Sequence, residues 1–215
     1  MVTQAGSLAR VTLIRGAELV AAPWKNGGGV TREVAAFPAQ AGGAAAGDFM
    51  WRVSVAEVAQ AGPFSRFDGV ERTLVLLAGA GMLLDELDGA SVVHTHALRQ
   101  PLDLARFAGE TRIDARLVDG ATRDFNLMVR RDVAQGELDV WHAEAQASAL
   151  RVLDADVVLL YCASGAVSVT LTAGEQAQTS RLDGGDTLRI DAPETLHCAL
   201  AGDGAVLAIS IRYTR

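Results

Sequence analysis

Apolar and polar residues alternate in short stretches along much of the chain, as in residues 50–58 and 123–131. A period of two is typical of β-strands, because successive side chains of a strand point to opposite faces of the sheet. Each stretch therefore predicts a strand with one apolar and one polar face. The polar positions are Arg52 and Ser54 in the first stretch, and Asp124, Asn126 and Arg130 in the second.

Two pairs of apolar stretches are each joined by a short glycine-containing turn. Residues 72–77 and 82–84 flank Gly79-Ala80-Gly81, and residues 157–162 and 167–172 flank Ser164-Gly165. Each pair predicts a β-hairpin. Because the same pattern recurs after roughly 85 residues, we expect an internal duplication.

Many short strands, glycine turns and few helical patterns favour an all-β chain with little helix, folded as two barrels or sandwiches. We expect the first barrel in residues 1–132 and the second in residues 133–215, with N-terminal strands able to cross between them. The alanine-rich residues 143–152 predict at most one or two helical turns. Residues 39–48 predict a surface loop, and residues 89–109 a less regular segment.

Composition narrows the class of protein. The chain has 215 residues, half of them hydrophobic, and a net charge of −7. This charge argues against nucleic acid as a partner, since phosphate binding requires a basic face. No apolar run approaches the ~20 residues that span a bilayer, and no signal-peptide pattern is seen. We therefore expect no membrane association, a cytoplasmic location, and free, buried thiols at Cys162 and Cys198.

A glycine-rich stretch, residues 24–33 (WKNGGGVTRE), combines three consecutive glycines with an aromatic anchor and several polar side chains. Glycine allows positive φ angles and close approach of another group. One interpretation is a binding loop whose donors are Lys25, Asn26, Thr31 and Arg32. A plain turn between two strands is an equally good interpretation of the composition.

Several blocks resemble known proteins. Residues 182–197 resemble the second cupin motif, in which Gly-Asp, an apolar strand, proline and histidine follow in order. Four further blocks resemble, in order and spacing, the motifs of the HutD/Ves family: residues 24–33, 51–56 (WRVSVA), 62–74 (GPFSRFDGVERTL) and 124–131 (DFNLMVRR). This resemblance implies a bicupin, with two cupin-type β-barrels in one chain, that is associated with bacterial histidine utilisation. It also implies a small-molecule ligand, with urocanate and N-formylglutamate as candidates.

A metal site is not expected in either half. A typical cupin site uses two histidines spaced H-x-H, a carboxylate and a later histidine. His197 has no histidine in the preceding strand pair, and His94-Thr95-His96 falls in the segment predicted to be less regular. We therefore predict neither a metal nor another cofactor.

Polar strand faces are the remaining candidates for chemistry. Arg32, Arg52 or Arg72 can offer a guanidinium fork to a ligand carboxylate, with orienting hydrogen bonds from Ser54 and Asn126. The full candidate ligand-binding set is Lys25, Asn26, Thr31, Arg32, Arg52, Ser54, Phe64, Arg72, Asp124, Asn126 and Arg130. The alternative is that these polar faces point to solvent while their apolar neighbours fill the interior, or that Asp124 only holds the arginines in place.

Three functional hypotheses follow. The favoured one is a non-catalytic binding protein for a small carboxylate-bearing metabolite. A second is a metal-free isomerase, lyase or hydrolase that uses Lys25, Asp124 or a histidine for proton transfer. A third is an interaction scaffold with a filled barrel. A homodimer is an expectation by analogy with other cupins only.

Overall fold

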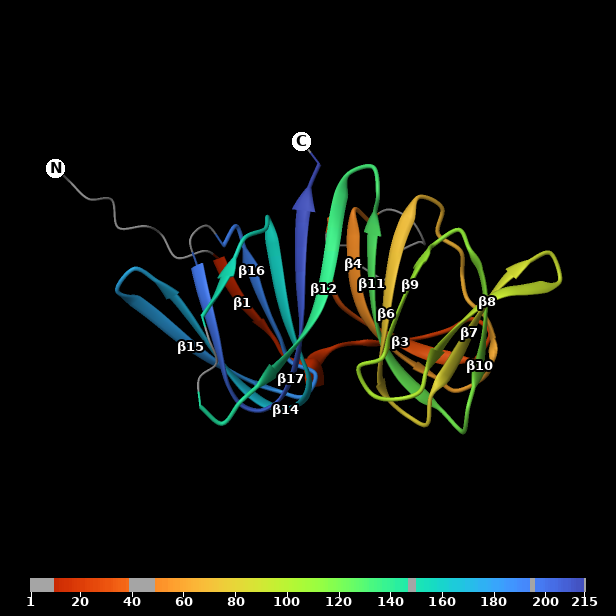
Figure 1. The fold of residues 1–215 in the computed structure, drawn as a ribbon, viewed down its shortest axis with the longest axis horizontal. Helices are drawn as coiled ribbons and strands as arrows, with labels where there is room; N and C mark the ends of the chain where they lie inside the picture. Colours follow the sequence, from red (N-terminus) through yellow and green to blue (C-terminus); the bar gives the residue numbers. More distant parts are fainter. Residues whose placement is uncertain (1–9, 39–48, 147–149, 194–195, 215) are drawn as a thin grey trace. The chain divides into compact units, whose positions relative to one another are not determined.

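The computed structural model describes residues 10–38, 49–146, 150–193 and 196–214, and these are almost entirely β-structure (Figure 1). A single 3₁₀ turn, η1 (Gly16–Glu18), occurs within these ranges. None of the described segments forms a helix long and apolar enough to cross a membrane. The expected loop at residues 39–48 lies outside the described residues.

The described chain divides into two compact units. The N-terminal unit comprises residues 19–135 and Thr214, and the C-terminal unit comprises residues 10–18 and 136–213. We expected a division at residue 132, with N-terminal strands able to cross between the barrels, and residues 10–18 belong here to the C-terminal unit. The first strand pairs with a strand of the C-terminal unit, residue 10 with residue 191 through residue 14 with residue 187. The backbone N–H and C=O groups of a strand need hydrogen-bond partners. For the first strand these partners lie on a strand of the C-terminal unit, so the first strand belongs to that unit.

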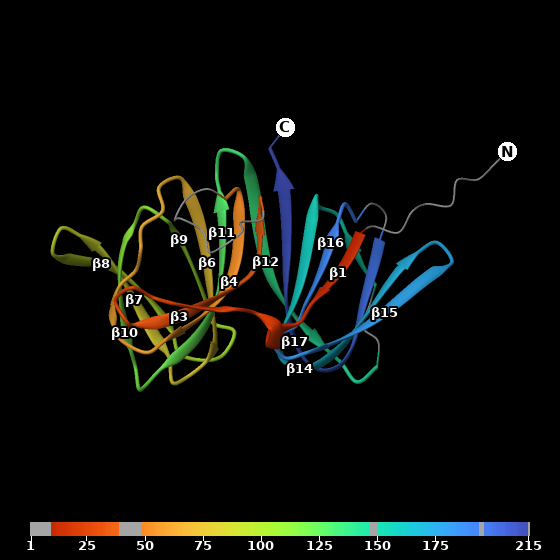
Figure 2. The same cartoon turned by 180° about the vertical axis from the view of Figure 1, so that it is seen from behind.

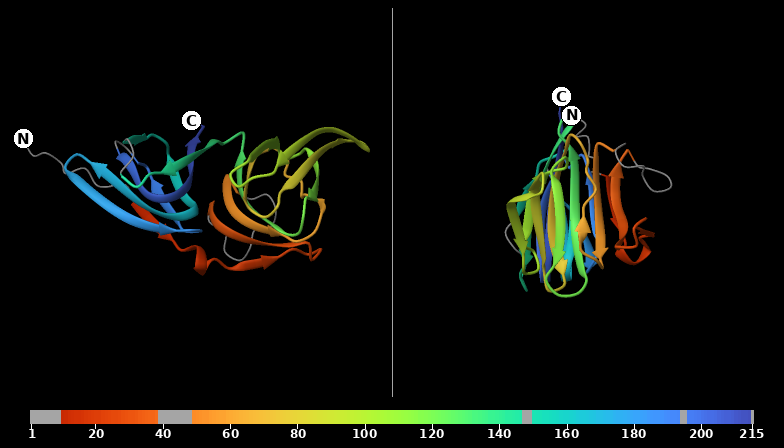
Figure 3. Two further views of the ribbon diagram at one scale, coloured as in Figure 1. Left: turned by 60° about the horizontal axis from the view of Figure 1, so that its bottom comes forward. Right: turned by 90° about the vertical axis from the view of Figure 1, so that its right-hand side faces the viewer.

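Two antiparallel sheets build the N-terminal unit. The six-stranded sheet has the order β2 (Ala21–Pro23), β3 (Gly29–Phe37), β4 (Trp51–Val58), β11 (Thr122–Arg130), β6 (Val70–Ala78) and β9 (Leu104–Ala108). The four-stranded sheet has the order β5 (Gly62–Pro63), β10 (Arg112–Leu117), β7 (Met82–Asp88) and β8 (Ser91–Leu98). Figure 3 shows these strands curving around a common interior.

One apolar core lies between these two sheets. Leu74 and Leu76 contribute to it from β6, and Met82 and Leu84 from β7. All four residues are fully buried. Alternate residues of the strands thus face inward, as the period of two predicts.

The turn at residues 79–81 does not join a hairpin. Strands β6 and β7 belong to different sheets, so the turn is a corner at which the chain passes from one sheet to the other. Gly79 and Gly81 have φ angles of 104° and 125°. A Cβ atom on Gly79 would lie 2.7 Å from the carbonyl oxygen of Ala121. Glycine is therefore required here because the chain passes from one sheet to the other, and the turn does not join two paired strands of a hairpin.

Residues 89–109 are more regular than expected, because they contain strands β8 and β9. His94 and His96 lie on β8, with His94 opposite Glu86 of β7. The sequence pattern did not predict this strand because six of the eight residues of β8 are exposed, including Val92 and Val93, at 56% and 62%. A strand exposed on both faces has no alternation for a pattern to detect.

A seven-stranded antiparallel sheet builds the C-terminal unit. Its order is β1 (Arg10–Ile14), β16 (Thr187–Asp191), β14 (Val157–Ala173), β17 (Leu196–Tyr213) and β12 (Ala134–Ala143), with β13 (Arg151–Leu153) on β17 and β15 (Gln176–Asp183) on β14. Figure 2 shows β1, in red, beside β16, in blue. The alanine-rich stretch ends in β13 rather than in a described helix, and residues 147–149 lie outside the described part.

The predicted hairpin around Ser164 is one continuous strand, β14. A register shift between Cys162 and Ser164 interrupts its pairing with β17, which then continues to Thr172. The extra residue is Ala163, and such a bulge bends a strand without reversing it. Gly165, two residues on, pairs with Gly204 and has a φ of 67°. The chain therefore bends at this point instead of turning back, and β14 pairs with the long strand β17 on both sides of the bend.

Candidate functional site

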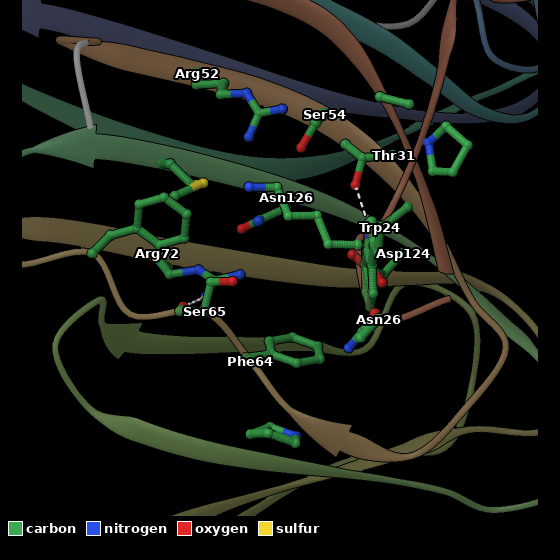
Figure 4. Close-up of a pocket in the computed structure, with 17 residues that line it drawn as sticks. Trp24, Asn26, Thr31, Arg52, Ser54, Phe64, Ser65, Arg72, Asp124 and Asn126 are labelled. Atoms are coloured by element: carbon green, nitrogen blue, oxygen red, sulfur yellow. Dashed lines mark hydrogen bonds between the residues drawn. The ribbon is translucent and has the colours of Figure 1, made fainter. Parts of the chain in front are cut away.

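The described structure contains a cavity of about 530 Å³ within the N-terminal unit. Small-molecule sites commonly occupy ~300–1,000 Å³, so the volume suits a metabolite. The cavity opens over the inner face of β4, β11 and β6 and is bordered by the loop between β2 and β3 (Figure 4). Nine of the eleven predicted site residues line it: Lys25, Asn26, Thr31, Arg52, Ser54, Phe64, Arg72, Asp124 and Asn126.

Strand register explains why the polar side chains gather. Asn126 of β11 lies opposite Ser54 of β4 on one side and Leu74 of β6 on the other. One step along, Met128 lies between Arg52 and Arg72 in the same way. These positions share a face because alternate residues of neighbouring strands point the same way. The interpretation that this polar face points to solvent is therefore wrong for these residues.

Arg32 and Arg130 do not line the cavity. Arg32 follows Thr31 on β3, and strand alternation sends its side chain to the other face, where it pairs with Glu57 at 2.8 Å. Arg130 lies on the same face as Asn126 but beyond the cavity, and its Nε donates to the carbonyl oxygen of Phe49 at 3.4 Å.

Several lining residues were not in the predicted set: Ala22, Pro23, Trp24, Ala56, Pro63, Ser65, Phe67 and Met128. Met128 could have been found, because it continues the alternation of Asp124 and Asn126. Ser65 and Phe67 follow β5 outside any periodic stretch, so their direction depends on how the chain crosses between sheets. Trp24 was expected only as an anchor.

The glycine loop has defined internal contacts. The Trp24 indole Nε1 donates to Thr31 Oγ1 at 2.7 Å, and the Gly28 amide donates to Asn26 Oδ1 at 3.0 Å. Gly27 has a φ of 70°, and a Cβ on Gly29 would lie 2.5 Å from the carbonyl oxygen of Glu57. The loop is thus a tight turn, as one interpretation of its composition predicted, and its residues Trp24, Lys25 and Asn26 also line the cavity.

Arg72 is held in an aromatic environment. Its guanidinium carbon lies 5.4 Å from the ring centre of Phe64, 5.7 Å from Phe67 and 5.0 Å from Phe107. Its NH1 donates to the carbonyl oxygen of Ser65 at 3.3 Å. Only 5% of the residue is exposed, and this burial lowers its pKa to about 10 although Asp124 acts in the opposite direction. The side chain remains a cation at neutral pH.

Asp124 is the carboxyl group of the cavity lining, and it is 2% exposed. Burial disfavours the charged form and raises its pKa to about 7, against the attraction of Arg72. Lys25 and Arg52 also line the cavity, and Arg52 Nε donates to Glu33 at 2.8 Å. The lining therefore carries more positive than negative charge at neutral pH, which favours an anion.

Histidines are absent from the cavity lining. Among the described residues, no group of three His, Cys, Asp or Glu side chains is placed to hold a metal ion. The H-x-H pair on β8 packs edge to face, with ring centres 4.5 Å apart, and His96 Nε2 lies 2.8 Å from Glu86 Oε1.

The described residues form an all-β protein of cupin-like fold, and a polar pocket lies in its N-terminal unit. The chain belongs to the HutD family, whose model matches residues 16–208. A 21.2 kDa protein from the hutC 3′ region of Pseudomonas putida is 31% identical over 191 residues, 88% of this chain and 91% of that one. Protein Ves of Citrobacter koseri is 39% identical over 118 residues, 54% of this chain and 56% of that one.

Solved structures agree with this assignment. HutD from Pseudomonas fluorescens SBW25 aligns with a TM-score of 0.76 at 28% identity, and a conserved protein from Pseudomonas aeruginosa PAO1 with 0.81 at 28%. Both alignments cover 96% of this chain and 100% of the other. YlbA from E. coli aligns with a TM-score of 0.67 at 10% identity, over 95% of this chain and 92% of that one. This last likeness concerns the fold alone.

Proposed function

We propose that the chain is a HutD-like, non-catalytic binding protein for a small carboxylate-bearing metabolite, acting in histidine utilisation. The observation that carries the proposal is the cavity, whose lining includes the almost fully buried Arg72 and Asp124. Buried polar groups are normally paired, since an unpaired one costs about 1–3 kcal/mol. A ligand that pairs them would recover this free energy on binding.

Charge supports an anionic ligand. Lys25, Arg52 and Arg72 line the cavity together with a single carboxyl group whose pKa is about 7. The relative from the hutC region supports histidine utilisation as the setting. Urocanate and N-formylglutamate each carry a carboxylate and are therefore the first ligands to test. We place the protein in the cytoplasm, where such metabolites arise.

The test is titration calorimetry, with thermal unfolding as a second readout, because a ligand that binds only the folded state raises its stability by mass action. We expect saturable binding of at least one of the two compounds. Arg52→Ala and Lys25→Ala should each weaken it by about tenfold or more, as a charge-assisted hydrogen bond is lost. Arg123→Ala is the matched control, since Arg123 is exposed on β11, next to Asp124 but outside the lining.

Failure of both compounds to bind the folded protein would contradict the proposal for this pathway. Equal effects of Arg123→Ala and Arg52→Ala would contradict the cavity as the site.

A second candidate, a metal-free enzyme, is favoured by one observation. Asp124, with a pKa of about 7, faces the same cavity as Lys25, and a group that titrates near neutral pH is suited to proton transfer. This candidate predicts that urocanate or N-formylglutamate is consumed on incubation with the protein, as followed by chromatography. It further predicts that Asp124→Asn abolishes the consumption while binding remains measurable.

A further inference from the structure

Three side-chain atoms on the inner face of β6 and β11 are buried and have no hydrogen-bond partner among the described residues. They are Arg72 Nε, Asp124 Oδ2 and Asn126 Oδ1, and all three residues line the cavity. Other such atoms in the described part, on Glu110, Thr122 and Thr187, belong to residues outside the cavity lining. The three cavity atoms thus form a group, which we call the orphan triad.

The orphan triad has a definite chemical polarity. Arg72 Nε is a donor, Asn126 Oδ1 is an acceptor, and Asp124 Oδ2 is an acceptor when ionised. A plain carboxylate offers acceptors only, so it can pair with Arg72 but leaves the two oxygens of β11 unpaired. Each of these oxygens needs a donor to complete it.

The protein does not supply that donor from the neighbouring strands. Asp124 lies between Ala56 of β4 and Leu76 of β6, and neither side chain has a polar hydrogen. Asn126 lies between Ser54 and Leu74, and its Oδ1 nevertheless accepts no hydrogen bond among the described residues. The geometry leaves the cavity side as the direction from which a donor can come.

We infer, on the basis of the proposed function, that the ligand is an anion that also carries an N–H or O–H donor. Its acidic group lies toward Arg72 and Arg52, and its donor pairs with Asn126 Oδ1. A second N–H or O–H group, in a ligand that has one, pairs with Asp124 Oδ2. A small anion of the same shape without a polar hydrogen binds more weakly.

Electrostatics agree with this division of the cavity. The charged groups that line it are Arg72 on β6, Arg52 on β4, Lys25 in the glycine loop and Asp124 itself. Because the pKa of Asp124 is about 7, the carboxyl group is partly ionised at neutral pH, and a donor that binds it stabilises the ionised form. A site that hydrogen-bonds a ligand N–H strongly disfavours an analogue that lacks it, since its own polar groups are left unpaired.

The experiment compares two pairs of compounds by titration calorimetry on the full chain. The first pair is urocanate and 3-(2-furyl)acrylate, which keeps nearly the same shape but has one ring oxygen and a C–H in place of the two imidazole nitrogens, and therefore no N–H. The second pair is N-formylglutamate and glutarate, which lacks the amide. In each pair that binds, we expect the donor-bearing compound to bind about ten- to hundredfold more tightly.

Asn126→Leu tests the assigned acceptor at similar volume. It should reduce the ratio of affinities within a pair toward one. Gln178→Leu, an exposed amide on β15, is the control and should leave the ratio as in the parent protein.

The outcomes separate the two claims. Equal affinities within a pair, or a ratio that Asn126→Leu leaves unchanged, would overturn the donor requirement while the binding function stands. No binding by any of the four compounds to the folded protein would overturn the proposed function for these metabolites and this inference with it.

Discussion

At the scale of single residues, Asp124 is the group whose chemistry the fold alters most clearly in the cavity. It is 2% exposed, and burial raises its pKa from the ordinary value of 3.8 to about 7. In the unfolded chain the same group ionises near 3.8. Between these two pH values the folded protein holds a proton that the unfolded chain has lost, so the native state becomes less stable as pH rises.

This difference predicts a pH-dependent stability. As pH rises from 4 to about 7, the Asp124 contribution should lower the free energy of unfolding by at most about 4 kcal/mol, since each pKa unit corresponds to about 1.4 kcal/mol. Asp124→Asn should remove that slope. Urea unfolding of both proteins at a series of pH values measures it.

A matched control for this prediction is Asp119→Asn, because Asp119 is exposed in a turn of the same unit. The variant at Asp119 should follow the parent curve. Parallel curves for the parent and Asp124→Asn would show that folding does not raise the pKa of Asp124.

At the scale of elements, the glycine loop depends on the absence of a side chain at one position. A Cβ on Gly29 would lie 2.5 Å from the Glu57 carbonyl oxygen and 3.1 Å from the Trp24 ring. The first contact is with backbone of β4, which cannot move without disturbing a strand that carries Arg52 and Ser54.

Gly29→Ala is therefore expected to lower the free energy of unfolding by about 1–3 kcal/mol, the usual cost of overpacking. It should also weaken ligand binding, because Trp24 and the adjacent Lys25 move with the loop. Gly184→Ala is the control, since a Cβ there would have its nearest contact at 3.8 Å. Thermal unfolding and calorimetry report the two effects. A fully stable Gly29→Ala protein with parent affinity would show that the loop tolerates a side chain.

Sequence patterns predicted the strands that have one polar and one apolar face. The alternation in β4 and β11 identified Arg52, Ser54, Asp124 and Asn126, and the structure places these four side chains at one cavity. The same pattern could not say whether the polar face points inward, because that depends on where the second sheet lies. In the structure, β7 and β10 of the second sheet pack over this face, so the polar side chains point inward.

Connections between strands were harder to predict. The turns at Gly79 and Gly165 are both predicted to be hairpins, yet Gly79 lies at a corner between sheets and Gly165 lies within the continuous strand β14, just after a bulge. A glycine with positive φ serves all three geometries, so its identity does not choose among them. Arg32 was assigned to the site from its place in the loop sequence, and strand alternation at Thr31 sends it to the opposite face.

At the scale of the whole molecule, the two units have different interiors. The core of the C-terminal unit is a cluster of buried apolar side chains from β14, β15, β16 and β17, among them Leu160, Val169 and Leu200. The N-terminal unit combines an apolar core with a polar cavity on the same sheet face. We therefore expect one ligand per chain, bound in the N-terminal unit.

Paired core variants distinguish the roles of the two units. Leu160→Ala should lower the free energy of unfolding by about 2–5 kcal/mol, the typical cost of truncating a buried leucine, and leave the dissociation constant of the folded protein unchanged. Leu74→Ala should lower stability to a similar extent and also weaken binding, because Leu74 lies beside Asn126 in the inner face. Calorimetry at a temperature where both variants are folded gives affinity and stoichiometry together. Two ligands per chain, or weaker binding in Leu160→Ala than in Leu74→Ala, would place a binding role in the C-terminal unit and contradict the assignment of the site to the N-terminal unit.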